Sequence, residues 1–199
     1  MKKFSLILVS IFLIFKFSIV SSYNSDPKIF ITELVNEAIN KLSDKSLTNE
    51  QKLNFIEEIA LEHVDVNALS LYTIGEIRKS ADKEILVRFQ KTFEKYFLKS
   101  LTSRLNEYSS NKLEVYSAEV KSSNYTIVKS KIVETTNNPE IKIDWRVYTK
   151  NPEKPLIRDL IVEGLSLART QKEEFASILS SNNNDINILI SKLDEFINN

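Results

Sequence analysis

Residues 144–179, which read DWRVYTKNPEKPLIRDLIVEGLSLARTQKEEFASIL, contain two predicted strands, a tight turn and the start of a helix. From Ile141 to Val147 the odd positions are apolar and the even positions are polar, which is the period-two pattern of a strand with one buried face. The segment 156–162 is apolar at positions of both faces, so we expect that strand to be covered on both sides. Gly164 then permits a backbone conformation or a close approach that a side chain would forbid.

Two helices are expected after this turn. The first is predicted to begin at Thr170, because Thr170 and Glu173 have the spacing of a capping box, and to run to Leu179. The second is expected over 186–197, where apolar residues recur at helical spacing. Ser166 is expected to bond the backbone where the chain leaves the sheet.

Four helices are expected before the sheet. The first begins at Pro27, and the second begins at the capping box formed by Thr48 and Gln51. Asp65 is expected to be the N-cap of a short third helix. The fourth and longest, about 82–108, carries a broad aromatic stripe. Such a stripe is usually plain core, but it could equally be the wall of a cavity.

After the helices the period changes from helical to alternating. Four strands are expected over 113–120, 125–134, 141–149 and 156–163, with connections short enough for antiparallel neighbours. Helices, then a four-stranded antiparallel meander, then two helices is an α+β order rather than a βαβ order. The chain of 199 residues has no internal repeat and no long linker. We therefore expect a single domain over 23–199.

Residues 1–22 have the pattern of a secretory signal peptide, so we expect export. Lys2 and Lys3 precede the hydrophobic stretch Phe4–Phe15, and small residues follow it. The stretch before Lys16 is too short to cross a bilayer, which takes about 20 residues. The chain has 27 basic and 27 acidic residues, so removing this segment leaves an acidic protein, for which nucleic acid is not a natural partner.

The sequence argues against an enzyme. Only two glycines occur, too few for a phosphate-cradling or dinucleotide-binding loop. The segment 164–168, GLSLA, nearly matches a nucleophile elbow, but the sole histidine, His63, lies on the wrong side of Ser166 in chain order. With no cysteine and no second histidine, His63 is not expected to bind a metal. Asp144 and Asp159 could form a catalytic carboxylate pair. The preferred interpretation is that both face solvent beside an arginine.

Several short segments together resemble a known family. The segments are Asp144 to Tyr148, Asp159, Glu163 to Leu167, Phe175, Val64 to Val66 followed by Gly75, and Phe89 with Phe93 followed by Leu101, Leu105 and Tyr108. Their order and spacing resemble those of the MlaC family, periplasmic phospholipid-binding proteins also called toluene-tolerance proteins. The chain departs from the family at Thr170-Gln171-Lys172 and at Asn182 to Asn184, where a threonine cap and asparagines that tolerate left-handed geometry are expected to preserve the fold.

The resemblance implies an apolar cavity between the sheet and the helices that encloses the acyl tails of a phospholipid and leaves the head group near solvent. Burial of two ordinary tails would contribute on the order of 20 kcal/mol gross, at roughly 0.8 kcal/mol per CH₂. We expect the following residues to line or border the cavity: Phe89, Phe93, Trp145, Val147, Leu160 and Val162.

By the same resemblance, the protein would carry phospholipid through the periplasm between an outer-membrane lipoprotein complex and an inner-membrane ABC transporter with an MCE-type subunit. This transport would maintain the lipid asymmetry of the outer membrane. No cofactor and no metal is expected. The direction of transport is not implied. Two alternatives stay open: a periplasmic binding or scaffold module of the same fold without a lipid, and a hydrolase that uses Ser166.

Overall fold

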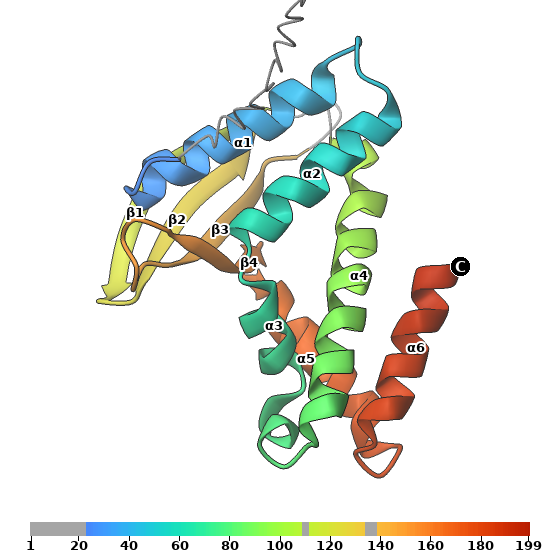
Figure 1. Ribbon diagram of the computed structural model, residues 1–199. Helices are drawn as coiled ribbons and strands as arrows, with labels where there is room; N and C mark the ends of the chain where they lie inside the picture. The colour runs from blue at the N-terminus through green and yellow to red at the C-terminus, as the bar shows by residue number, and fades with distance from the viewer. Residues whose placement is uncertain (1–22, 109–111, 134–138) are drawn as a thin grey trace, which may run out of the picture.

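The computed structural model describes residues 23–108, 112–133 and 139–199, so the predicted signal peptide lies outside the described residues. Helices precede and follow one antiparallel sheet (Figure 1), which confirms the α+β order. The helices are α1 (Pro27–Ser43), α2 (Asn49–His63), α3 (Val66–Thr73), the 3-10 helix η1 (Gly75–Lys79), α4 (Lys83–Tyr108), α5 (Leu167–Ser180) and α6 (Ile186–Asn198). The strands are β1 (Leu113–Ser122), β2 (Tyr125–Ile132), β3 (Ile141–Tyr148), β4 (Leu156–Val162) and β5 (Leu165–Ser166).

The sheet has five strands in the order β1-β2-β3-β4-β5, so the expected count of four is wrong by one short strand. The backbone turns at Glu163 and Gly164, which both have positive φ, 49° and 82°. Two consecutive residues of this kind make a tight hairpin turn. The turn folds Leu165 and Ser166 back onto Val162 and Ile161 as β5. The special role predicted for Gly164 is thereby confirmed.

Helix α5 begins at Leu167, three residues before the predicted start at Thr170. Its N-cap is Ser166, whose Oγ accepts a hydrogen bond of 3.0 Å from the N–H of Arg169. Thr170 lies within the first turn, and its hydroxyl donates to the carbonyl of Ser166. The prediction failed because a threonine inside a helix can bond the carbonyl four residues back instead of capping. The predicted backbone bond of Ser166 is confirmed.

The helix starts predicted upstream are confirmed. Thr48 and Gln51 form both hydrogen bonds of a capping box at the start of α2. Asp65 caps α3, with its Oδ1 accepting from the N–H of Ala68 at 3.1 Å. Helix α3 ends at Thr73, just before Gly75, which has a φ of +58°.

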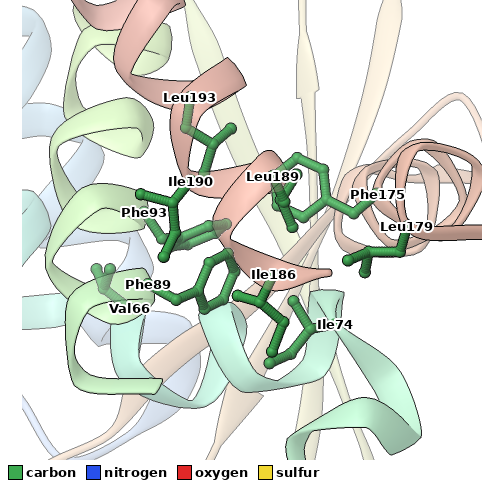
Figure 2. Packing of buried hydrophobic residues seen from close by; sticks show 10 residues of the cluster. All are labelled: Val66, Ile74, Phe89, Phe93, Phe175, Leu179, Ile186, Leu189, Ile190 and Leu193. Carbon is green, nitrogen blue, oxygen red and sulfur yellow. The ribbon is translucent and has the colours of Figure 1, made fainter. Parts of the chain in front are cut away.

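The buried apolar side chains form two separate clusters. In the first, here called the sheet cluster, α1 packs on one face of the sheet (Figure 1). Its buried members are Phe30, Ile31, Leu34, Val35, Val128, Val147 and Ile157. The second, here called the helix cluster, lies among α3, α4, α5 and α6 (Figure 2). Its buried members are Val66, Ile74, Phe89, Phe93, Phe175, Leu179, Ile186, Leu189, Ile190 and Leu193.

Within the described ranges, none of the helices combines the length and the apolar character needed to cross a bilayer.

Candidate functional site

Two of the six expected lipid-contacting residues, Phe89 and Phe93, belong to the helix cluster. They lie one turn apart on α4, and their rings pack edge-on against that of Phe175 on α5, with ring centroids 6.3 and 6.2 Å apart (Figure 2). Their exposed fractions are 0% and 2%. In this structure the aromatic stripe of α4 therefore forms solid core at these two positions.

Three others lie on the face of the sheet that α1 covers. Val147 on β3 is fully buried in the sheet cluster, and Trp145 and Leu160 are half-buried against it. Trp145 and Leu160 are direct cross-strand partners on β3 and β4. The indole N–H of Trp145 donates a hydrogen bond of 2.8 Å to the hydroxyl of Ser130, which fixes the ring over the sheet.

Val162, the sixth, is half-buried at the end of β4 and pairs with Ile143. The structure thus brings together the sheet positions Trp145, Val147 and Leu160 and places Phe89 and Phe93 in a different cluster.

The two clusters meet at the junction between α2 and α3. Val64 is half-buried and packs against both clusters. Its backbone forms an isolated bridge with Ile157 of β4, and the N–H of Asp65 donates to the carbonyl of Ile157 at 2.9 Å. The junction is therefore attached to β4 by main-chain contacts.

Arg158 reinforces this attachment with its side chain. Its Nε donates to Oδ2 of Asp65 at 2.8 Å, and its Nη2 forms an ion pair with the same oxygen at 2.6 Å. Its Nη1 donates to the hydroxyl of Tyr125 at 2.9 Å. The guanidinium also stacks 3.5 Å above the ring of Tyr148. Burial lowers the pKa of Arg158, but the hydrogen bonds with Tyr125 and Asp65 outweigh it and hold the pKa above its usual value. Arg158 therefore stays charged and holds α3 against the sheet.

Asp159 does not face solvent, which corrects the expectation for this residue. Its side chain is 1% exposed. It accepts hydrogen bonds from the hydroxyl of Ser166 at 2.6 Å and from the N–H of Ala168 at 3.0 Å, and Arg146 lies 3.6 Å away. The folding back of β5 buries it, because that turn places the start of α5 directly over β4. Asp144, in contrast, is half-buried on β3.

The hydroxyl of Ser166 is occupied by structural bonds. It donates to Asp159 and accepts from the N–H of Arg169. The only histidine, His63, lies elsewhere, with its ring 4.5 Å from that of Tyr23 and 5.5 Å from that of Phe30. A serine nucleophile needs a base in hydrogen-bond reach. The described geometry pairs Ser166 with a carboxylate and a backbone amide, which is the arrangement of a helix cap.

His63 is buried at the end of α2, and its Nε2 has no hydrogen-bond partner in the described part of the chain. Burial lowers the pKa of His63, because the charged imidazolium would lose its hydration, although the nearby Glu62 opposes this effect. His63 is therefore neutral at neutral pH and serves as a packing residue. Among the described residues, no group of three or more metal-ligand side chains is close enough to hold an ion.

A groove of about 680 Å³, here called the outer groove, lies on the opposite face of the sheet from α1. Helix α3 forms its wall, and β1, β2, β3 and β4 form its floor. None of the six expected residues lines it. The lining residues are Ala68, Leu69, Tyr72, Glu119, Lys121, Ser122, Tyr125, Ile127, Lys129, Asp144, Arg146, Arg158, Ile161 and Ala168.

From the sequence, the residues on the floor of the outer groove are predicted only to lie on the polar side of alternating strands. Nothing in the sequence indicates that α3 covers part of this side.

Comparisons with known proteins agree with the fold and the family resemblance. None of the curated proteins matches the chain. The fold is similar to that of the phospholipid-binding protein from Ralstonia solanacearum, solved in complex with a phospholipid, with a TM-score of 0.70, 18% sequence identity, and coverage of 87% of this chain and 97% of that chain. The model of the family described as MlaC protein matches residues 32–195. Since this match spans most of the chain, the protein belongs to the MlaC family.

Proposed function

We propose that this protein is a periplasmic phospholipid carrier that shields acyl tails from water. The observation that carries the proposal is the family match over residues 32–195, together with a fold shared with a phospholipid-binding protein that holds a phospholipid. A soluble carrier must cover both tails almost completely, because each exposed CH₂ costs roughly 0.8 kcal/mol.

The outer groove is poorly suited to the tails. Six charged side chains line it, those of Glu119, Lys121, Lys129, Asp144, Arg146 and Arg158. Contact with hydrocarbon would remove water from these charges without replacing its hydrogen bonds, which is costly. The tails therefore belong on the apolar side of the sheet.

The two-cluster core supports a location between the sheet and the helical body. Each cluster is bordered by half-buried apolar side chains, such as Trp145 and Leu160 beside the sheet cluster and Phe97 beside the helix cluster. Half-buried side chains gain further burial when a tail covers them. We propose that the acyl tails bind between the half-buried side chains beside the sheet cluster and those beside the helix cluster. Trp145, Val147, Leu160 and Val162 would form the sheet wall. The half-buried Phe97 of α4 would form the helical wall, with Phe89 and Phe93 in the core of the helix cluster.

The wider role follows from family membership. The carrier would pass phospholipid between an outer-membrane lipoprotein complex and an inner-membrane ABC transporter with an MCE-type subunit. Residues 1–22 would direct its export. The protein itself would contribute binding rather than chemistry, since Ser166 and Asp159 bond each other and the start of α5.

A charged residue in the sheet wall tests the proposal. Leu160→Asp should lose the phospholipid that copurifies with the exported protein, because a carboxylate beside a tail must be desolvated. Leu165→Asp is the matched control, since Leu165 is 60% exposed on β5, and it should keep its lipid. Lipid is measured by organic extraction and mass spectrometry, and folding by circular dichroism.

Leu160→Asp could unfold the sheet cluster, so a second variant is needed. Val162→Trp adds bulk at a half-buried position without removing core volume. It should lower the lipid content of a folded protein. Equal lipid in Val162→Trp, in Leu165→Asp and in the unmodified chain would contradict the proposed site. No phospholipid in any of them would favour a binding or scaffold module without a lipid.

A further inference from the structure

The outer groove is separate from the proposed lipid site. On β2, Ile127 lines the groove and the next residue, Val128, belongs to the sheet cluster on the other face. On β3, Arg146 and Val147 are related in the same way. Because successive side chains of a strand point to opposite faces, a molecule in the outer groove cannot touch the sheet wall proposed for the tails.

Several charged groups in the outer groove have unused hydrogen-bonding capacity. Arg146 has one ion pair, to Asp159 at 3.6 Å, and Lys129 has one, to Glu119 at 3.6 Å. Both distances exceed those of ordinary charged hydrogen bonds, about 2.7–2.9 Å. The carboxylate of Asp144 has no hydrogen bond or ion pair to any described residue. These side chains are held in a concave surface with donors and an acceptor directed to solvent.

Cationic groups outnumber acidic ones on the lining. Four cations face the groove, and two acids accompany them: Lys121, Lys129, Arg146 and Arg158 against Glu119 and Asp144. The acidic partners of the two arginines are more buried than the arginines. The side chain of Asp159, the partner of Arg146, is 1% exposed, and that of Asp65, the partner of Arg158, is 18% exposed. Lys121 is paired with Glu119 at 2.5 Å and Arg158 with Asp65 at 2.6 Å. Arg146 and Lys129, whose ion pairs are both 3.6 Å long, are therefore the cations available to an approaching molecule.

The wall of the outer groove is apolar. Leu69 and Tyr72 on α3 line it opposite the charged floor. Tyr72 is 42% exposed, and the amine of Lys172 lies 5.0 Å from the centre of its ring. Exposed tyrosine and arginine side chains are the types that most often dominate binding at protein interfaces.

We propose that the outer groove docks an extended segment of a protein partner in which an acidic side chain lies beside an apolar one. The carboxylate would bind Arg146 and Lys129, and the apolar side chain would pack on Leu69 and Tyr72. A flat membrane surface fits a concave groove poorly. A peptide segment can enter it, and it supplies both kinds of group at the spacing of neighbouring residues.

The probe is a short fluorescein-labelled peptide in which glutamate and leucine alternate. Two control peptides carry lysine in place of glutamate, or serine in place of leucine. Binding to the mature protein is followed by fluorescence anisotropy, and the contact surface is mapped by amide chemical shifts. We expect the glutamate-leucine peptide alone to bind, with shifts confined to α3 and to β1, β2, β3 and β4. Anionic phosphatidylglycerol vesicles, tested by cosedimentation, should not bind.

Lys129→Glu should weaken binding of this peptide by tenfold or more, because it replaces an attraction by a repulsion. The matched control is Lys192→Glu, an exposed position on α6 with the same change of charge, and it should bind as the unmodified chain does. Arg146→Gln tests the second cation, with folding checked by circular dichroism. All three variants should keep their copurifying phospholipid, so this result is separable from the carrier proposal.

Three results would overturn the docking proposal. The first is no binding of the glutamate-leucine peptide up to about 1 mM, which corresponds to roughly 4 kcal/mol. The second is equal binding by Lys129→Glu and Lys192→Glu. The third is binding of the vesicles but not of the peptide, which would assign the outer groove to a membrane surface.

Discussion

Arg158 on β4 and Asp65 at the start of α3 are 93 positions apart in the chain and are joined by a hydrogen bond of 2.8 Å and an ion-pair contact of 2.6 Å. The same carboxylate caps α3 through the N–H of Ala68. One side chain therefore determines both where α3 begins and how it lies against the sheet. This places the wall of the outer groove opposite its floor.

Replacing Asp65 should cost more than the loss of an ordinary cap. Asp65→Ala removes a cap, worth about 1 kcal/mol, and leaves the half-buried guanidinium of Arg158 without its charged partner, which costs a further 1–3 kcal/mol or so. Asp26→Ala is the control, since Asp26 caps α1 and is exposed. Urea unfolding should show the larger loss for Asp65→Ala. Equal losses would mean that the pair with Arg158 adds no stability.

Stability should fall in mild acid because of His63. The pKa of this buried histidine is lower in the folded chain than the ordinary value of 6.5. The unfolded chain therefore binds a proton more readily, so the contribution of His63 is complete above pH 6.5 and is lost as the pH falls towards the folded pKa. His63→Phe should flatten the dependence of the unfolding free energy on pH in this range. An unchanged slope in that variant would show that other groups cause it.

Ser166 should matter for stability and not for catalysis. Ser166→Ala removes the cap of α5 and the hydrogen bond to buried Asp159, and should lower the unfolding free energy by about 1–3 kcal/mol. Ser177→Ala, at an exposed position of the same helix, should change it by about 0.5 kcal/mol at most. In a screen of ester substrates, the unmodified chain and Ser166→Ala should be equally inactive. Ester hydrolysis that disappears in Ser166→Ala would revive the hydrolase interpretation.

Gly164 should be sensitive to substitution through its backbone alone. An added Cβ would meet no atom within 4 Å, but the φ of +82° is unfavourable for other residues. Gly164→Ala should therefore cost about 1–2 kcal/mol, and Gly164→Asn less, because asparagine tolerates left-handed geometry better. Thermal unfolding of the two variants checks this order. If alanine is tolerated as well as glycine, the turn before β5 can relax without strain.

The sequence predicted local features better than the contacts between elements. The caps at Thr48 and Asp65 were predictable because a polar side chain and nearby backbone amides suffice to start a helix. The start of α5 was not, because Thr170 and Glu173 imitate a capping box. The true cap, Ser166, depends on β5 and on Asp159 of β4.

The site was predicted less completely, for a related reason. Alternation on β3 correctly placed Trp145 and Val147 on the apolar side of the sheet. On β4 alternation predicted opposite faces for Ile157 and Leu160, but a register shift against β3 brings both to this side. The stripe of α4 could not show which neighbours its aromatic side chains would meet, and Phe89 and Phe93 pack on Phe175. The outer groove depends on the contact between Arg158 and Asp65, which no local pattern reveals.

The central claim is that this chain carries phospholipid. The most direct measurement is organic extraction of the protein purified from the periplasm without added detergent, followed by mass spectrometry of the extract. The account predicts phospholipid in amounts comparable to the protein, with two acyl tails protected from phospholipase until the protein is unfolded. An extract with no more phospholipid than that of an unrelated exported protein, prepared in the same way, would contradict it.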